Sequence, residues 1–396
     1  MSTLWIETAP ISPDARNNGD SFQENSWQAI FACQLCVRPF SEWVDLKWGF
    51  NAGALLEEFI DRQKLFIESQ YAVAVPMHMS SVSQDQRSLT LRMITLPGEG
   101  LQVGLIGRVC APSSEDAEKR AMAYARGLMS IVPYDYRLYM ASSQADFKRI
   151  AGRDLLMEQP LCVDGQPGNS NIAEIKRGEA LLPAQQGFQV VPGLWQASLR
   201  SNEQVWRAMA ALPHPALLNI ALQSTVMMED EQQALWNIKK NMPAPEKNQN
   251  VFSPFSSNVS WGESYIKRRL APWKKFFCLQ VHVVQVGEFD EGLLRSIGAA
   301  ITRDSADLSL PGYQWLRPAS TQDQLDWLSQ LSQSQIIQSF DRLEQLADLE
   351  EVCAVFRLPH HAPLLGLPGV NFLCPSTSTP MDSAVAVLEP ALSEKK

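Results

Sequence analysis

SLTLRMITLPGEGLQVGLIGRVCAPSSEDAEKRAMAYARGLMSIVPYDYRLYM, residues 88–140, carries the clearest secondary-structure pattern of the chain. Apolar and polar residues alternate at 89–93 and again at 103–109, and PGEG at 97–100 stands between the two runs. Side chains of a strand point alternately to its two faces, so this alternation on both sides of a glycine-rich turn predicts a β-hairpin.

A helix and a further strand are expected after the hairpin. Ser113, with Asp116 three residues later, fits a capping-box-like start. Apolar residues then recur at helical spacing between 117 and 132, on one face of the helix. Pro133 ends this pattern, and 136–140 is typical of a returning strand. The whole stretch predicts a β-β-α-β unit.

A second stretch, 276–317, repeats this order in weaker form. An alternating strand at 279–283 leads to a turn at 287–290, a helix at 293–301 and a strand at 313–316. The repetition indicates a duplicated split β-α-β unit. We therefore predict an α+β fold, with two ferredoxin-like β-α-β subdomains and a C-terminal helical segment.

The length of 396 residues exceeds one typical core and indicates two to three domains. Changes in pattern and composition set the expected boundaries. They give a flexible lead-in at 1–26, a first α+β subdomain at 27–160, a strand-helix middle region at 161–242, a linker at 243–258, a second α+β subdomain at 259–320, a helical segment at 321–370 and a tail at 371–396.

Composition and charge exclude some classes of protein. A formal net charge of -9 argues against a surface that binds nucleic acid all over, which would need a strongly basic field. The N-terminus lacks the basic and apolar segments of a signal peptide, and no apolar run approaches the ~18 residues of a membrane span. We therefore expect a cytoplasmic protein without a membrane span.

The seven cysteines do not form an evident disulfide or metal framework. Cys33 and Cys36 make a CxxC within a strand, where their side chains point to opposite faces, and no further ligand pair accompanies them. Cys353 with His360 and His361 invites a thiol-nucleophile interpretation. Burial habits favour packed free thiols at all three cysteine positions.

Nucleotide and hydrolase motifs are missing from the sequence. There is no GxxxxGK[ST] phosphate loop, no GxGxxG that opens a helix after a strand, and no GxSxG elbow. Gly104 and Gly107 lie inside the expected second strand of the hairpin, where a phosphate cradle would not form. We therefore expect neither a cofactor nor a self-sufficient enzyme.

One enzyme alternative remains open, a divalent-metal nuclease. Asp164 followed by Glu174 and Lys176 has the spacing of the D…(E)xK motif. In such a site the two carboxylates hold Mg²⁺ and the lysine stabilises developing charge. The alternative without catalysis is that these residues lie on an exposed strand face, because the charged residues continue at Arg177 and Glu179.

A basic-aromatic stretch at 261–275 is the candidate contact site. Basic side chains with interleaved aromatics suit a phosphate backbone with stacked bases. Two other interpretations are a contact with a partner protein and a solvated helix face with snorkelling lysine stems. The candidate residues are Trp261, Tyr265, Lys267, Arg268, Arg269, Trp273, Lys274 and Lys275.

Three stretches carry a resemblance to a known family. LEEVCAVFRLP at 349–359, closed by GLPG at 366–369, resembles the FRLP…PG segment just ahead of the core of bacterial HerA/FtsK-like and conjugative (type IV secretion) ATPases. The stretch 89–133 is similar to a run in the N-terminal regions of these ATPases. Residues 212–236 fit the same order.

This resemblance implies an assembly role without catalysis. In that family the nucleotide-binding core follows the PG segment, whereas this chain ends 27 residues after Gly369. We therefore expect a non-catalytic subunit or adaptor of a HerA-like DNA-translocating ATPase assembly, in conjugation or in defence against foreign DNA. Its partner would be a separate ATPase subunit within an oligomeric complex. A structural subunit of an unrelated large machine is the remaining alternative.

Overall fold

The fold is taken from a computed structural model of residues 1–396. The structure describes the chain in separate ranges. They are residues 4–11, 26–38, 52–71, 87–156, 161–163, 166–168, 170–183, 188–198, 201–241, 254–272, 274–302, 311–337, 342–360 and 370–375.

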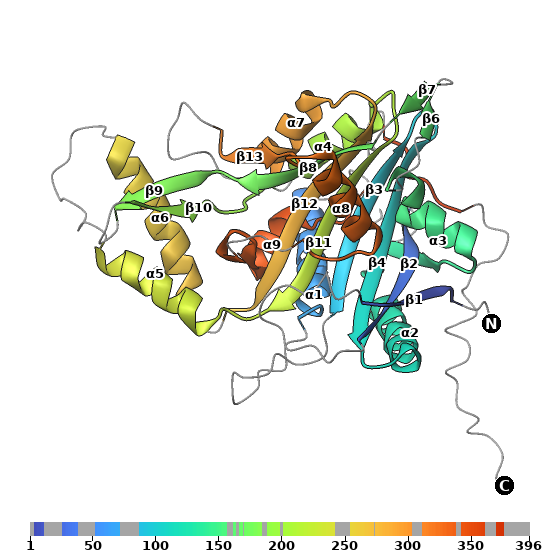
Figure 1. Cartoon of the computed structure of the whole chain (residues 1–396), viewed down its shortest axis with the longest axis horizontal. Helices are drawn as coiled ribbons and strands as arrows, with labels where there is room; N and C mark the ends of the chain where they lie inside the picture. The colour runs from blue at the N-terminus through green and yellow to red at the C-terminus, as the bar shows by residue number, and fades with distance from the viewer. Residues whose placement is uncertain are drawn as a thin grey trace, which may run out of the picture.

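One antiparallel sheet forms the centre of the molecule (Figure 1). Its main path runs β1-β2-β4-β3-β11-β12-β8-β13, while β5 also pairs with β2 and β14 with β12. The strands are β1 (Ile6–Pro10), β2 (Trp27–Val37), β3 (Arg87–Leu96), β4 (Gly100–Ala111), β5 (Tyr136–Met140), β8 (Ser170–Arg177), β11 (Ala216–Thr225), β12 (Phe276–Val286), β13 (Tyr313–Leu316) and β14 (Leu346–Asp348).

The N-terminal half and the C-terminal half of the sheet have the same topology. In the first half the chain order is β2-α1-β3-β4-α2-β5, and the strands lie in the order β5-β2-β4-β3. In the second half the chain order is β8-α4-β11-β12-α7-β13, and the strands lie in the order β13-β8-β12-β11. The helices are α1 (Ala52–Glu68), α2 (Ser114–Ile131), α4 (Ser201–Ala210) and α7 (Glu291–Ile301).

The halves meet through equivalent edge strands. β3 pairs antiparallel with β11, with Ser88 opposite Gln223 and Thr95 opposite Ala216. Two copies of one arrangement that join by the same strand in opposite directions are related by an approximate twofold rotation. The sheet is therefore continuous across both halves.

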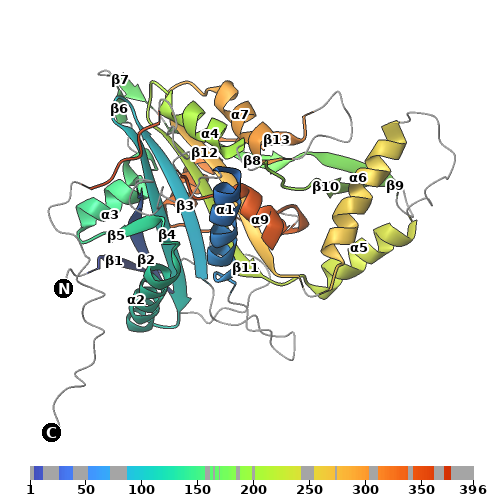
Figure 2. The ribbon, with the colours of Figure 1, turned by 180° about the vertical axis from the view of Figure 1, so that it is seen from behind.

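The main hydrophobic core lies on one face of this sheet, beneath the helices of both halves. Strand residues such as Phe31, Leu91 and Val281 meet side chains of α1, α2, α4 and α7 there, and helix α9 (Leu349–Val355) joins the same layer. Figure 2 shows α1 and α9 side by side on this face. Alternation of apolar residues along each strand produces this face.

The opposite face of the sheet has smaller hydrophobic clusters and also carries buried polar side chains. Helices α3 (Gln144–Ala151) and α8 (Thr321–Ser332) cover part of it. Arg92 is fully buried there and donates to Asn219 Oδ1 at 2.8 Å and to the carbonyls of Ala151 and Leu331. Burial and nearby Arg153 lower the pKa of Arg92 to about 9. The two carbonyls lie at helix C-termini, where the helix dipole stabilises a cation.

A side lobe extends from the second half, at the left of Figure 1. Its small core includes Val191, Leu235 and Tyr265. In the first half the connection from β3 to β4 is only a short turn, in which Gly98 has φ 79°. The lobe consists of β9 (Glu179–Pro183), β10 (Phe188–Pro192), α5 (Glu229–Asn241) and α6 (Pro254–Arg269).

Three short elements complete the described structure. The two-stranded pair β6 (Leu161–Val163) and β7 (Gln166–Gly168) stands apart from the main sheet. Two 3-10 turns lie at Arg153–Leu155 and Arg342–Glu344. No helix in the described part of the chain has the length and apolar content that a membrane crossing requires.

The structure confirms the α+β class and the local pattern at 88–140. The Ser113 hydroxyl accepts from the Asp116 backbone N–H at 3.1 Å, as the capping pattern predicts. Strand β8, which falls in the expected middle region 161–242, lies between β12 and β13 in the sheet, and the expected domain boundaries stay a prediction. The grouping into ferredoxin-like subdomains stays a prediction at this level.

Candidate functional site

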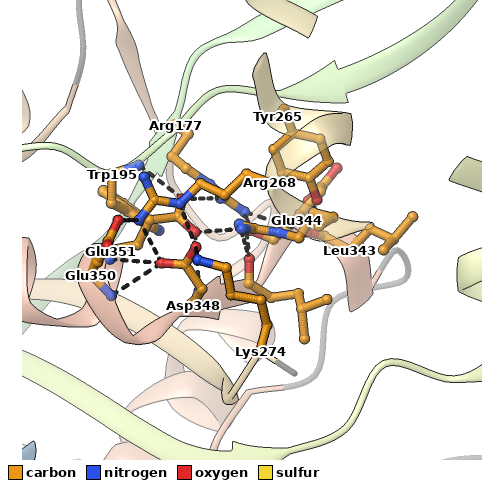
Figure 3. A network of polar contacts seen from close by, with 12 residues as sticks. Arg177, Trp195, Tyr265, Arg268, Lys274, Leu343, Glu344, Asp348, Glu350 and Glu351 are labelled. Carbon is orange, nitrogen blue, oxygen red and sulfur yellow. Dashed lines mark hydrogen bonds and ion pairs between the residues drawn. The ribbon is translucent and has the colours of Figure 1, made fainter. Parts of the chain in front are cut away.

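The basic-aromatic stretch forms the end of α6 and the connection that leads into β12. Tyr265 is buried in the lobe core and its hydroxyl donates to the Leu343 carbonyl at 3.0 Å. Trp261 lies on α6, but its side chain is outside the described residues, as is the whole of Trp273. Three basic residues of the stretch, Arg268, Arg269 and Lys274, pair with an acidic corner at residues 348–351. Figure 3 shows Arg268 and Lys274 at this corner.

A buried ion cluster forms the centre of this corner. Glu351 lies 3.1 Å from Arg177 Nη1 through Oε1 and 2.5 Å from Arg269 Nη1 through Oε2, and all three side chains are almost fully buried. Burial lowers the pKa of Arg177. Burial also opposes the charge on Arg269, but Glu351 more than offsets this and raises the pKa of its guanidinium. A buried charge needs such pairing, because desolvation alone costs several kcal/mol per ion.

Aromatic rings and backbone carbonyls complete the surroundings of the two guanidinium groups. The centre of the Tyr265 ring lies 4.5 Å from Cζ of Arg269 and 5.7 Å from Cζ of Arg177. Arg177 also donates to the Glu344 carbonyl, and Arg269 donates to that of Leu346 at 2.6 Å. These contacts tie β8 and α6 to the segment that precedes α9.

The start of α9 supplies the other acidic groups. Asp348 and Glu351 form a reciprocal capping box, in which each side chain accepts a backbone N–H of the other residue. Arg268 binds the Asp348 carboxylate through two nitrogens and lies 2.6 Å from Glu350. Burial opposes ionisation of Asp348, but the hydrogen bond from Arg268 and its charge hold the pKa of this carboxyl below its usual range.

The remaining lysines differ in their surroundings. Lys274 lies 3.7 Å from Asp348, and Lys275 lies 2.5 Å from Glu68 at the end of α1. Lys267 is exposed, and within the described residues it makes no ion pair. Internal acids therefore neutralise most of the positive charge of this stretch. A nucleic-acid contact here stays a prediction, and Lys267 is the one basic residue of the stretch that makes no ion pair with any described residue.

Two residues of the nuclease alternative, Glu174 and Lys176, lie on the face of the sheet that points away from the main core. Glu174 is 7% exposed, and burial raises its pKa to about 7 even though Lys176 opposes this. Lys176 binds Glu344 at 2.7 Å and lies 4.0 Å from Glu174. Asp164 lies outside the described residues. Wherever side chains are described, no group of three or more His, Cys, Asp or Glu is placed to hold a metal ion.

The three cysteines predicted to be packed free thiols are all free in the structure, and they differ in how deeply they are buried. Cys33 and Cys36 are buried free thiols, as predicted, and Cys33 donates to the Leu105 carbonyl at 3.3 Å. Cys353 is partly buried, and burial raises its pKa to about 12, which disfavours a thiolate nucleophile. His360 is buried in the main helix layer, and His361 lies outside the described residues.

The FRLP segment that follows α9 lies between the two halves. The Gln63 side chain of α1 accepts from the Leu358 backbone N–H at 3.0 Å and donates to its carbonyl at 2.9 Å. The His360 ring lies 5.0 Å from Phe59 of α1 and 5.0 Å from Trp206 of α4. Since α1 and α4 are equivalent helices, this segment occupies the junction of the halves.

The sequence interpretation identified the basic residues but missed their acidic partners. The signal was present as Asp348 followed by Glu351 three residues later, which is a capping-box pattern. A scan against protein-family models matched no family, and a search of curated proteins found no relative. The interpretation of the site therefore rests on its own geometry.

Proposed function

We propose that this chain is a non-catalytic subunit or adaptor of a HerA-like DNA-translocating ATPase assembly, in conjugation or in defence against foreign DNA. The observation that carries the proposal is the position of the FRLP segment. In the ATPases that this chain resembles, that segment leads into the motor core. Here it is held between α1 and α4 by the two Gln63 hydrogen bonds and by the rings around His360.

We further propose that each half is a ferredoxin-like unit and that the chain is an internal pseudo-dimer. The support is the shared chain order of strand, helix, two strands, helix and strand, with the same strand order in both halves. The three stretches that carry the family resemblance also lie together. β3 pairs with β11, and α9 packs beneath β12, the next strand of the sheet.

The buried ion cluster then has a structural role in this adaptor. Glu351 connects β8 and α6 to the start of α9, so the FRLP segment cannot shift without separating buried charges. Such separation is costly, because each unpaired ion would remain desolvated. The cluster would give the assembly a rigid platform at the point where the chain leaves the junction.

A surface for the ATPase is proposed on the first half. Leu65 of α1 is 65% exposed and Tyr134, just after α2, is 51% exposed. Arg62 lies 4.5 Å over the Tyr134 ring and one turn before Leu65, so these side chains are neighbours. Exposed apolar and aromatic side chains beside an arginine are the composition that protein interfaces favour.

The test is complex formation with a candidate motor. Each HerA-like ATPase encoded near this chain would be co-expressed with it, and the complex measured by size-exclusion chromatography with light scattering. We expect a stable complex, in which only the motor hydrolyses ATP. Absence of a complex with every such ATPase would overturn the proposal, and so would stoichiometric ATP hydrolysis by the highly purified chain alone.

The surface has its own matched variants. Leu65→Ser combined with Tyr134→Ser should weaken the complex at least tenfold, since it removes two central apolar contacts. Val190→Ser combined with Leu316→Ser is the control, because these exposed apolar side chains lie on β10 and β13. Equal affinity of both variants would reject this surface while leaving the adaptor proposal intact.

The nuclease alternative gains no support from the site geometry, because Glu174 and Lys176 lie beneath covering residues. Incubation of DNA with the chain and Mg²⁺ or Mn²⁺ tests it directly. We expect no cleavage. Metal-dependent cleavage that Glu174→Ala abolishes would establish the nuclease in place of the adaptor.

A further inference from the structure

The segment 370–375 returns to the sheet after α9 and lies along the start of β4. The Leu101 N–H donates to the Asn371 carbonyl at 2.7 Å, and the Leu373 N–H donates to the Leu101 carbonyl at 2.8 Å. The pairing of β4 with β2 ends at Gly104. The returning segment therefore fills an edge of β4 that β2 leaves unpaired.

Side chains fix the register of this returning segment. The Gln34 side chain of β2 donates to the Leu373 carbonyl at 2.8 Å, and Asn371 Nδ2 donates to the Glu99 carbonyl at 2.9 Å. Gly100 has φ 145°, and a Cβ at this position would lie 2.3 Å from the Asn371 carbonyl oxygen. The close approach therefore requires glycine at position 100.

This register brings two thiols together. Gln34 and Cys36 point to the same face of β2, because side chains two residues apart on a strand share a face. Gln34 binds the carbonyl of Leu373, and Cys374 is the next residue. The Cys36 and Cys374 side chains are hydrogen-bonded to each other. Both are free thiols, Cys36 buried and Cys374 exposed.

The surroundings assign different roles to the two thiols. The hydrogen bond with Cys36, the charge of Arg137 and the Val37 backbone N–H lower the pKa of Cys374, although partial desolvation of its sulfur, which Cys36 covers on one side, opposes this. The same hydrogen bond and burial raise the pKa of Cys36. An exposed thiol with a lowered pKa beside a buried thiol with a raised pKa is the arrangement of an attacking and a resolving cysteine.

We propose that Cys36 and Cys374 form a reversible dithiol–disulfide pair, which locks the returning segment 370–375 onto β2 under oxidising conditions. With hydrogen peroxide as oxidant, the Cys374 thiolate attacks one peroxide oxygen, forming a sulfenic acid and releasing hydroxide. The Cys36 sulfur then attacks the sulfenic sulfur, and water leaves with the Cys36 proton. In total, two thiols and one peroxide give one disulfide and two waters.

The lock acts on the part of the chain that follows GLPG at 366–369. In the dithiol form, hydrogen bonds and the Phe372 ring, 6.1 Å from Trp206, hold the returning segment. In the disulfide form, a covalent bond fixes it to β2 as well. Oxidation would therefore set how firmly the segment 370–375 is held against the sheet. This pair is independent of the proposed adaptor function.

The full chain is tested as a reduced protein that is exposed to equimolar hydrogen peroxide. Peptide mapping by mass spectrometry should find one dominant bridged peptide pair, containing Cys36 and Cys374, which a dithiol reductant releases. Hydrogen exchange of the Leu373 amide should slow at least tenfold in the oxidised form. Cys374→Ser and, separately, Cys36→Ala should remove both effects, whereas Cys353→Ser should keep them.

Two results would overturn the proposal. One is that Cys374 accumulates as sulfenic or sulfinic acid without a bridge while circular dichroism shows the native fold. The other is that the bridge forms without any change in Leu373 exchange. The Cys374→Ser variant keeps the comparison valid, because position 374 is exposed and the main core does not include it.

Discussion

At the start of α9, the Glu351 carboxylate forms ion pairs with two buried arginines and accepts hydrogen bonds from two backbone N–H groups. Its neighbour Glu350 binds Arg268 but is 61% exposed. The two adjacent carboxylates thus differ in solvation rather than in partner type. Solvation decides the energy, because water replaces a lost partner only at an exposed site.

Glu351→Gln should destabilise the fold strongly. The amide keeps the size of the side chain but removes the carboxylate that pairs with both Arg177 and Arg269, at an expected cost of about 3–5 kcal/mol. Glu350→Gln is the control, with an expected cost below ~1 kcal/mol. Urea unfolding at pH 7 measures both values. Similar midpoints for the two variants would contradict the structural role of the cluster.

Glu174 gives a pH-dependent prediction. Its pKa rises on folding from 4.5 to about 7, because burial disfavours the charged form. The folded state therefore prefers the protonated carboxyl, whose stabilising contribution is present below pH 4.5 and is lost as pH rises towards 7. Glu174→Gln should accordingly stabilise the fold at pH 8, by about 3 kcal/mol at most, and by less than ~1 kcal/mol at pH 5.

Urea unfolding of wild type and variant at the two pH values tests this dependence. Glu263→Gln serves as the control, because Glu263 is exposed on α6. Its effect should be small and equal at both pH values. A stabilisation by Glu174→Gln that does not grow between pH 5 and pH 8 would show that Glu174 is ionised without penalty in the folded protein.

At the scale of elements, α6 is a helix whose last turn points its charges into the protein. Tyr265 and Arg269 are buried one turn apart, and Arg268 binds Asp348 and Glu350. Lys267 alone among the three consecutive basic residues is exposed. The sequence of such a helix resembles a basic binding surface, whereas its field is largely cancelled by α9.

Lys267→Gln should leave DNA binding unchanged. A phosphate contact by this lysine would contribute about one unit to the slope of log affinity against log salt. We expect weak binding of the wild type, with the same slope for the variant, in fluorescence anisotropy at several salt concentrations. Lys148→Gln, on α3, is the control. A selective loss of slope in Lys267→Gln would support a nucleic-acid contact at α6.

At the scale of the whole molecule, the pairing of β3 with β11 makes the two halves one sheet. Each half taken alone would expose the long edge of its second strand. Exposed edges with alternating apolar residues pair readily with other chains. The pairing of β3 with β11 therefore protects two edges by burying them against each other.

A fragment of residues 1–160 should not stay monomeric. Its β3 edge would be unpaired and would pair with a second copy, in place of β11. Light scattering of the refolded fragment should give a dimer or larger species, while the full chain keeps β3 covered. Thr90→Pro, which removes one backbone donor of β3, should reduce association. Because Thr90 is itself buried, circular dichroism checks that the variant fragment keeps its fold. A monomeric, folded fragment would contradict this prediction.

Much of the local structure was predictable from the sequence, and much of the candidate site was not. The hairpin, the cap at Ser113 and the strand at 136–140 follow from patterns within a few residues. The basic-aromatic stretch was identified by the same kind of pattern. Its acidic partners were missed, because Arg268 and Asp348 are 80 residues apart in the chain.

The sequence by itself determined the α+β class, since strand and helix periods, turns and caps are local properties of the chain. Only the tertiary structure decided that β8 inserts between β12 and β13 and that β3 meets β11. It also decided that Arg269 is a buried structural ion rather than a surface charge. Burial and ion pairing depend on which segments, far apart in the sequence, come together in space. Patterns within a few residues do not specify those partners.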